Sequence, residues 1–265
     1  DNNAKKKADP APVPVTAVKV EENEIPVTLK VVGRAEAYES VALKSRIDGQ
    51  VAAVLFTEGQ HVNKGDVLVR LDPTDFAAKL QQLEATAARD EALIAKSRAD
   101  TARYSALRDR NFVSEEKVND IRTNEAAATA NLRASRAAAE VARLQLSYTT
   151  VRAPITGVVG ARLVFPGSAV KINETNLAVV NRIQPLLVGF SIPEKHLSRL
   201  RTAIKGGEMK VDVSLPNDPT QRMAGKVIFL DNTVDATTGT ILMKASLPND
   251  DEKLTPGQFL NVTLI

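Results

Sequence analysis

The sequence contains no cysteine, so it can form no disulfide, no thiolate zinc site and no cysteine nucleophile. Tryptophan is also absent and aromatic residues make up 4% of the chain, which leaves few side chains on which nucleic-acid bases could stack. No apolar run approaches the ~20 residues that a membrane-spanning helix needs. The net charge is only +3, so neither nucleic acid nor another polyanion is expected as a partner.

Glycine and proline are missing from the middle of the chain. No glycine lies between Gly65 and Gly157, and no proline between Pro73 and Pro154. Of the 74 residues from 73 to 146, 19 are alanine, the residue that loses least on entering a helix. This stretch is therefore predicted to be helical.

Two helices are predicted here. Asp72 followed by Pro73 indicates the first helix start, because aspartate caps a helix and proline is tolerated at its first position. The pattern breaks at 109–113, and Ser114 followed by two glutamates predicts a second start. Apolar or small residues recur three and four apart, as on the seam of a coiled coil, at Phe76, Leu80, Leu83, Ala87, Ile94, Val118, Ile121, Ala128, Leu132, Ala139, Ala142 and Leu146.

A short connection between two such helices makes them antiparallel neighbours. At 1.5 Å per residue, the first helix would reach roughly 55 Å, which is too long for a compact domain of this size to cover. The hairpin is therefore expected to project from the body.

An internal repeat flanks the hairpin. Seven residues recur with the same identity after 108 positions, and each copy reads as short strands joined by glycine turns. The pairs are Ile47/Ile155, Gly49/Gly157, Val51/Val159, Ala53/Ala161, Leu55/Leu163, Gly59/Gly167 and Val62/Val170. Because a few short strands are marginal by themselves, the two copies are expected to close one small sandwich together.

These half-motifs, with the run Glu58-Gly-Gln-x-Val-x-Lys-Gly-Asp-x-Leu68, resemble split biotinyl/lipoyl carrier modules. Interrupted by a helical hairpin, they resemble the periplasmic adaptor (membrane fusion protein) family of tripartite efflux pumps of the resistance-nodulation-division (RND) type. The segments 151–157, 235–241 and 254–259 are also typical of that family. The resemblance covers nearly the whole chain.

The resemblance implies an elongated, multidomain α+β fold. It consists of a split lipoyl-like β-sandwich (barrel-sandwich hybrid), an inserted antiparallel coiled-coil hairpin, a β-barrel and a partial membrane-proximal segment. The expected parts are a flexible tether (1–14), membrane-proximal strands (15–27), the barrel (28–37 and 183–265), the lipoyl-like domain (38–72 and 147–182) and the hairpin (73–146). Short linkers between these modules are expected to allow hinging.

Beyond the second half-motif, several strands separated by turn residues predict the barrel. They are expected at 186–190, 209–215, 224–230, 240–247 and 258–265, and a short helix is expected to begin at 192–197, with Pro193 in its first turn. The resemblance implies that the barrel also takes a strand near 27–32.

Four residues near the hairpin tip are candidate docking residues. Spacing alone favours a structural role, with Leu107 on the seam, Ser114 as an N-cap and Arg103 as a solvated charge. The spacing of Arg103, Leu107 and Ser114 matches the family's Arg-Leu-Ser motif, which implies docking of an outer-membrane channel. In that reading Leu107 is the apolar anchor, Arg103 and Ser114 donate hydrogen bonds, and Tyr104 supports them.

No catalytic or metal site is predicted. His61 and His196 lie far apart in sequence without metal-spaced partners, and Asp231 and Asp235 belong to turn-forming sequences. A carrier protein needs a modifiable lysine at a hairpin turn. Neither half shows that attachment motif, so Lys64 is interpreted as a turn lysine and no cofactor is expected.

The sequence and the resemblance together predict a non-enzymatic periplasmic adaptor, anchored to the inner membrane of a Gram-negative bacterium. It would link an inner-membrane RND multidrug transporter to an outer-membrane channel-tunnel protein, with several copies forming a ring, a trimer or hexamer. The chain begins without methionine, as a processed or trimmed chain would, so the anchor is expected in a missing N-terminal part. The alternatives are an adaptor of an ATP-driven or heavy-metal exporter, a lipoyl/biotinyl-type carrier protein, and a structural coiled-coil scaffold.

Overall fold

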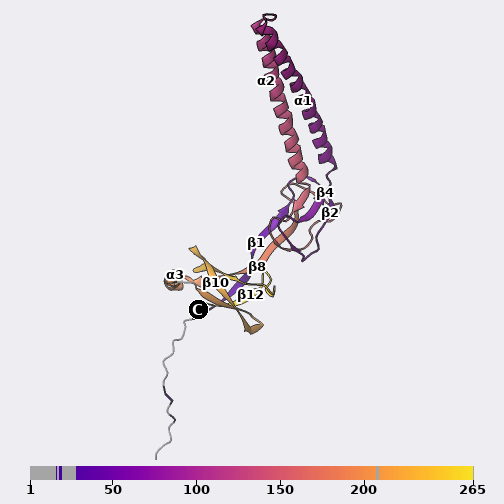
Figure 1. Cartoon of the computed structure of the whole chain (residues 1–265). Coiled ribbons are helices and arrows are strands. Elements are labelled where there is room, and N and C mark those ends of the chain that lie inside the picture. Colours follow the sequence, from indigo (N-terminus) through magenta and orange to yellow (C-terminus); the bar gives the residue numbers. More distant parts are fainter. Residues whose placement is uncertain (1–15, 17, 20–27, 207–208, 265) are drawn as a thin grey trace, which may run out of the picture.

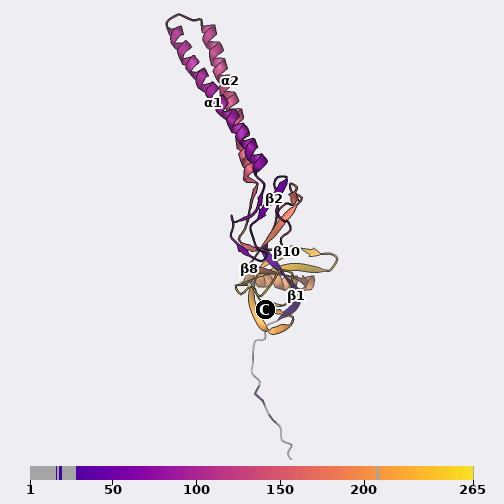
Figure 2. The ribbon, with the colours of Figure 1, turned by 90° about the vertical axis from the view of Figure 1, so that its right-hand side faces the viewer.

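Two long antiparallel helices project from a β-rich body in the computed structural model (Figures 1 and 2). The structure describes residues 16, 18–19, 28–206 and 209–264. The predicted tether (1–14) and most of the predicted membrane-proximal strands (15–27) lie outside these residues. No helix within the described ranges is long and apolar enough to cross a membrane.

The helices of the projection are α1 (Thr74–Asp109) and α2 (Glu115–Ser147), which pack against each other along their length. α1 begins one residue later than predicted, because its N-cap is Pro73, which makes no side-chain capping bond. The Asp72 carboxylate precedes the cap and accepts bonds from the backbone N–H and hydroxyl of Thr74. All twelve predicted seam residues are buried or half-buried. The seam also includes Asp90 and Ser135, which the apolar pattern left out.

The remaining elements are β1 (Leu29–Lys44), β2 (Gly49–Val54), β3 (His61–Val62), β4 (Val67–Leu71), β5 (Thr150–Arg152), β6 (Gly157–Val159), β7 (Ala169–Val170), β8 (Asn176–Pro193), the 3₁₀ turn η1 (Glu194–His196), α3 (Leu197–Gly206), β9 (Lys210–Leu215), β10 (Asp218–Asp235), β11 (Thr240–Leu247) and β12 (Phe259–Leu264). The predicted short helix therefore begins later than expected, because β8 continues through Pro193.

Strand pairing reproduces the internal repeat. β2 pairs with β7 through Gly49 and Val170, and β3 pairs with β6 through Val62 and Gly157, so each half exchanges a strand with the other at equivalent positions. Buried residues of both halves form a single core. The two copies therefore fold as one unit related by an approximate two-fold axis.

The turns obey the same symmetry. The backbone N–H of Lys64 donates to the Thr156 hydroxyl at 3.0 Å, and the N–H of Ile172, 108 residues after Lys64, donates to the Asp48 carboxylate at 2.7 Å. Gly65 has a φ of 99° and its counterpart Asn173 a φ of 58°. Asparagine is among the few residues other than glycine that accept this left-handed conformation, so the turn survives the change of residue.

Six strands close a barrel in the order β1-β12-β9-β10-β11-β8, with β8 pairing back to β1. Its interior is a second core, distinct from that of the sandwich. β1 and β12 pair from Leu29 and Leu264 onward, which is the extra strand that the resemblance implied. β10 is much longer than the strand predicted at 224–230.

The expected short linkers between sandwich and barrel are absent from the described chain, and that prediction was wrong. β1 and β8 each run through both modules and remain paired from Gly33 and Phe190 to Lys44 and Asn176. The pairing is interrupted by an irregularity between Ala37 and Glu39. A continuous two-stranded ribbon, bulged near Tyr38, therefore joins the two cores.

Candidate functional site

The tip of the hairpin is a tight turn at 110–113 between α1 and α2. The Leu107 carbonyl accepts bonds from the backbone N–H groups of Arg110 (3.2 Å) and Phe112 (3.0 Å), and Asn111 adopts a φ of 61°. The Phe112 side chain is 73% exposed in this turn, which lies at the far end of the projecting helices (Figure 1). Sequence reasoning did not single out Phe112, although an aromatic residue inside a predicted polar turn was a signal that could have identified it.

Ser114 is the N-cap of α2, as the structural interpretation predicted. Its hydroxyl oxygen accepts the backbone N–H of Lys117 at 3.3 Å. A hydroxyl that accepts one bond still carries a proton that it can donate. The cap is therefore compatible with a second role for Ser114 as a donor to a partner.

The other three predicted tip residues lie on the last two turns of α1. Arg103 pairs with Asp100 one turn earlier, and its side chain is 65% exposed. Tyr104 and Leu107 are half-buried. Among the described residues no hydrogen bond or ion pair joins Arg103 to Ser114, so the four residues share one end of the hairpin without forming a bonded cluster.

A groove of about 410 Å³ lies between α1 and α2 near the tip of the hairpin. Arg103 and Tyr104 line its α1 side, and Lys117 and Ile121 line its α2 side. The α2 residues were not predicted as functional from sequence. The groove brings basic and apolar side chains of both helices next to two of the predicted docking residues.

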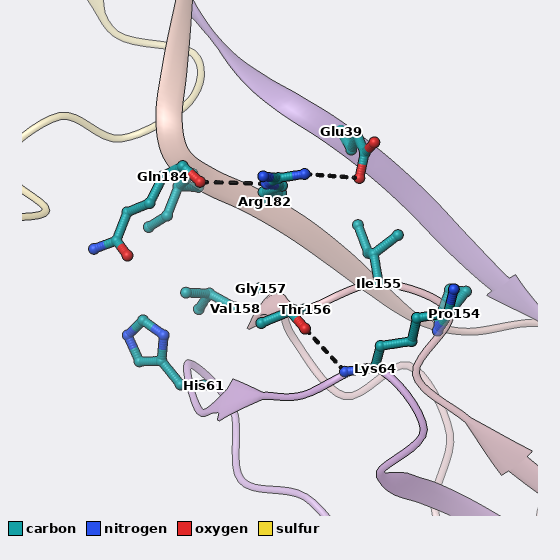
Figure 3. Close-up of a pocket in the computed structure, with 11 residues that line it drawn as sticks. Glu39, His61, Lys64, Pro154, Ile155, Thr156, Gly157, Val158, Arg182 and Gln184 are labelled. Atoms are coloured by element: carbon teal, nitrogen blue, oxygen red, sulfur yellow. Dashed lines mark hydrogen bonds and ion pairs between the residues drawn. The ribbon is translucent and has the colours of Figure 1, made fainter. Parts of the chain in front are cut away.

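A second cavity, of about 530 Å³, lies where the sandwich meets the ribbon (Figure 3). Lys64 and Thr156 lie on one side of it, and Arg182 of β8 faces them from the ribbon. The Arg182 guanidinium lies 3.8 Å from the Glu39 carboxylate and 5.0 Å from the centre of the Tyr38 ring, at the irregularity of β1. The guanidinium therefore stacks beside one of the two irregularities in the pairing of β1 with β8.

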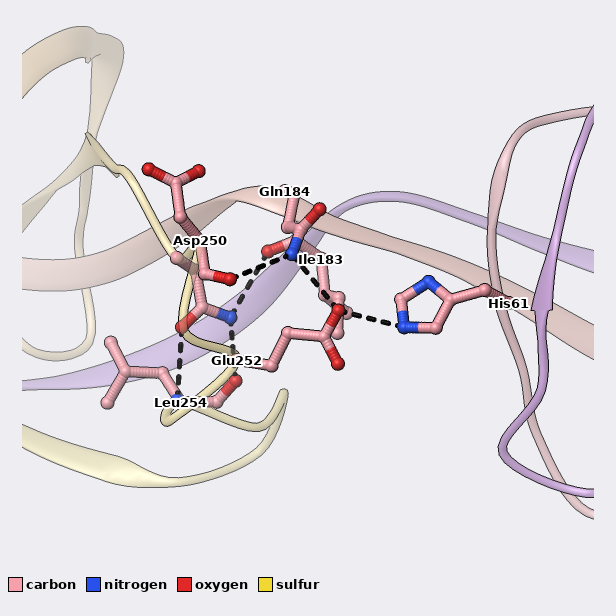
Figure 4. A network of polar contacts seen from close by, with 7 residues as sticks. His61, Ile183, Gln184, Asp250, Glu252 and Leu254 are labelled. Atoms are coloured by element: carbon pink, nitrogen blue, oxygen red, sulfur yellow. Dashed lines mark hydrogen bonds and ion pairs between the residues drawn. The ribbon is translucent and has the colours of Figure 1, made fainter.

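A polar network joins the sandwich to the barrel beside that cavity (Figure 4). Glu252 lies in a turn of the barrel. Its carboxylate oxygen Oε1 lies 2.9 Å from His61 Nε2 of the sandwich and accepts a hydrogen bond from Gln184 Nε2 of β8 at 3.0 Å. The side-chain amide of Asn249 holds this turn in place. Its NH₂ group donates to the carbonyls of Ile183 and Leu254, and its oxygen accepts the backbone N–H of Leu254. His61 is exposed on the surface, and its side chain also connects two modules.

Within the described ranges, no three His, Asp or Glu side chains are grouped as a metal site would need. The carboxylate of Asp235 accepts the backbone N–H groups of Thr237 and Thr238, which is the turn role predicted for it. Asp231 lies within β10 and not in a turn, so the turn prediction was wrong for it; its carboxylate accepts the N–H groups of the next two residues where the pairing with β11 is irregular.

Two family models cover most of the chain. Residues 39–182 match the barrel-sandwich hybrid domain of RND membrane fusion proteins, and residues 185–265 match the β-barrel domain of the same proteins. The chain belongs to the RND membrane fusion protein family. No catalytic activity is indicated for this family by the matches.

Curated relatives of this membrane fusion protein are multidrug resistance proteins named MdtA. That of Proteus mirabilis is 35% identical over 253 residues, covering 95% of this chain and 62% of the relative. That of Cronobacter turicensis is 35% identical over 257 residues, covering 96% and 62%. The chain therefore spans about three fifths of the length of these relatives.

Solved structures share the fold. A MacA–MexA chimera that carries the α-hairpin domain of Pseudomonas aeruginosa MexA superposes with a TM-score of 0.71 at 22% identity, covering 91% of this chain and 82% of the chimera. The membrane fusion protein Spr0693 of Streptococcus pneumoniae R6 superposes with a TM-score of 0.72 at 17% identity, covering 89% and 98%.

Proposed function

We propose that this protein is the periplasmic adaptor of a tripartite multidrug efflux pump and has no catalytic role of its own. The observation that carries the proposal is the projection of a two-helix arm from a body made of a split sandwich and a closed barrel (Figure 1). The 36 residues of α1 span roughly 54 Å at 1.5 Å per residue. Such an arm carries its exposed tip far from the barrel, so one chain can contact two partners at once.

The two partners are an inner-membrane RND transporter at the barrel and an outer-membrane channel at the tip. The RND type of both family models supports the choice of transporter over an ATP-driven or heavy-metal exporter. The name of the curated relatives supports multidrug substrates. In this arrangement the adaptor is periplasmic and held at the inner membrane.

At the tip, Leu107 anchors the channel and Arg103 and Ser114 donate hydrogen bonds, with Tyr104 in support. The paired substitutions Leu107→Asp and Arg103→Asp place two carboxylates on this surface without touching the capping bond of Ser114. Cells that depend on this pump are expected to lose drug resistance, and cross-linking of the adaptor to the channel is expected to disappear.

The matched control is Arg133→Asp with Ala137→Asp, at exposed positions of α2 away from the tip. It changes the net charge of the hairpin by the same amount as the tip pair. This control should retain both resistance and cross-linking. The tip assignment is wrong if the tip pair behaves like the control.

Several copies pack side by side into a ring, a trimer or hexamer, through the sandwich. Its surface exposes large apolar side chains of the repeat at Leu55 and its counterpart Leu163, together with Phe165 and Ile172. Exposed apolar side chains that form one patch mark a protein–protein interface, so these four residues are the candidates for contacts between copies. Native mass spectrometry of the adaptor bound to its transporter tests the ring, and a single adaptor per transporter would exclude it.

The domain division given by the sequence remains part of this proposal. Two separate hydrophobic cores support a barrel unit and a lipoyl-like unit with the hairpin inserted between its halves. Limited proteolysis should cut at the hairpin tip before it cuts within either core, since the tip turn is exposed.

A further inference from the structure

The cavity of about 530 Å³ at the joint between the sandwich and the ribbon has two walls that come from different elements (Figure 3). One wall is the turn at Lys64 together with the segment 154–158 of the sandwich, and the other is Arg182 and Gln184 of β8. The volume lies in the range of about 300–1,000 Å³ that small-molecule sites occupy in proteins. The proposed adaptor function gives this cavity no role.

The fold leaves positive charge on both walls without a hydrogen-bond acceptor. The Lys64 ammonium group has no hydrogen-bond or ion-pair partner within the described ranges. On the opposite wall, Arg182 Nε donates to the Gln184 carbonyl at 3.3 Å, but Arg182 Nη1 lies 3.8 Å from the Glu39 carboxylate, which is too long for a hydrogen bond. The terminal N–H groups of the guanidinium can therefore donate to a ligand in the cavity.

The acids near these cations do not balance them. Glu39 is the one acidic side chain in the lining of the cavity. Glu252 lies next to it through His61, but its Oε1 atom already accepts Gln184 Nε2 and lies 2.9 Å from His61 Nε2 (Figure 4). With His61 neutral, two cations in the lining therefore stand against one acid.

The internal repeat shows that the turn does not require a lysine. The equivalent corner of the sandwich, 108 residues away in sequence, forms the same turn with Ile172 in place of Lys64. Asp48 takes the place of Thr156 there and accepts the same bond from the backbone N–H. The strands at the two corners also pair in the same register. The basic side chain is therefore a property of the corner that faces β8 and not of the turn.

We propose that this cavity binds a small organic anion, with its carboxylate or sulfonate group held by Lys64 and Arg182 and its apolar body against Ile155 and Val158. The planar guanidinium can donate two parallel N–H bonds to such a group, and the lysine adds a point charge on a flexible stem. The apolar part of the lining favours an amphipathic anion over a hydrated inorganic one, since burying apolar surface is favourable. Because β8 continues into the barrel, a ligand held from both walls adds a contact across the joint.

The test titrates the purified chain with two fluorescent probes. Anilinonaphthalene sulfonate is an aryl sulfonate, and phenylnaphthylamine has the same rings without the sulfonate. We expect the chain to bind the sulfonate more tightly than the neutral compound. Lys64→Gln and Arg182→Gln each remove the charge of one wall, and each should weaken binding of the sulfonate about tenfold while leaving the neutral compound unaffected. The difference should shrink as the salt concentration rises.

Lys171→Gln is the matched control, because it removes the same charge from the equivalent turn of the other half. It should bind the sulfonate like the wild type. Lys64 makes no side-chain bond within the described ranges, so Lys64→Gln should melt like the wild type and decides the test even if Arg182→Gln weakens the ribbon.

Two results would overturn the inference. One is that Lys64→Gln binds the sulfonate as tightly as Lys171→Gln, which would mean that the probe lies on exposed apolar side chains such as Phe165. The other is that the wild type binds the two probes equally well. Neither result bears on the proposed function, which cross-linking from the hairpin tip tests separately.

Discussion

At the scale of single residues, two glycines at equivalent repeat positions have opposite surroundings. A methyl group on Gly157 would overlap the backbone carbonyl of Asn181, whereas one on Gly49 would meet nothing within 4 Å. Gly157→Ala is expected to destabilise the sandwich by about 1–3 kcal/mol, because backbone atoms cannot move aside cheaply. Gly49→Ala should be neutral or stabilising by about 0.4–1 kcal/mol. Urea titration of both variants measures the difference in stability. Equal unfolding midpoints for the two variants would contradict the close approach of Gly157 to the Asn181 carbonyl.

Asp90 is a buried acid on the hairpin seam, 6% exposed. Its pKa is lowered from the ordinary value of 3.8, first by the bond from Arg89 and also by the Ser135 hydroxyl, against the opposing effect of burial. A lowered pKa means that the ionised form stabilises the fold at neutral pH, and that this stabilisation is lost as the pH falls through the folded-state pKa.

We therefore expect the melting temperature of the hairpin to fall on acidification from about pH 7 to about pH 3, and to fall less in Asp90→Asn than in the wild type. Circular dichroism at 222 nm follows the helices. Asp120→Asn changes an exposed acid on α2 and should melt like the wild type across this range. Identical acid sensitivity in Asp90→Asn and the wild type would show that Asp90 does not contribute.

Spacing alone did not place Asp90 on the seam. The apolar residues on either side of it, Ala87 and Ile94, were found because apolar periodicity is the strongest signal in a sequence. A carboxylate at a seam position looks like a gap in that pattern, and only the structure shows the Ser135 hydroxyl of α2 beside it. The same holds for Lys117, whose place in the groove depends on how α2 packs against α1.

At the scale of elements, Ser114 combines a structural bond with a proposed docking bond, and two substitutions separate them. Ser114→Ala removes the cap of α2 and should cost about 0.5–2 kcal/mol, seen as faster hydrogen exchange in the first turn of α2. Ser114→Asp keeps a capping oxygen but has no hydroxyl proton to donate. It should preserve the slow exchange and still weaken channel binding. Normal channel binding by Ser114→Asp would limit Ser114 to its capping role.

The elements that the sequence located well are those with a complete local signal. The start of α2 was found through Ser114, and the start of α1 was placed within one residue through Asp72, because adjacent residues carry each signal. The continuous ribbon was missed for the opposite reason. Around Tyr38 both faces of β1 are largely exposed, so no apolar alternation marks the strand there. A polar stretch that pairs along its whole length is indistinguishable from a linker in sequence.

At the scale of the whole molecule, the network at Glu252 holds the barrel against the sandwich. Exposed ion pairs contribute about 0–1 kcal/mol, and the ribbon of β1 and β8 already joins the modules. Glu252→Ala should therefore broaden the distribution of distances between spin labels at 112 and 229 and leave its mean unchanged. Lys253→Ala, which breaks an exposed pair with Asp251 in the same turn, is the control. A shift of the mean in Glu252→Ala would show that the network, and not the ribbon, sets the orientation.

The central claim is that one chain contacts two different membrane proteins at its two ends. Photo-cross-linking in cells tests it directly, with the probe placed either at Leu107 of the tip or at Phe229, which is exposed on β10 of the barrel. We expect the probe at 107 to capture the outer-membrane channel and the probe at 229 to capture the inner-membrane transporter. Capture of the same partner from both positions, or of the transporter from the tip, would contradict the account.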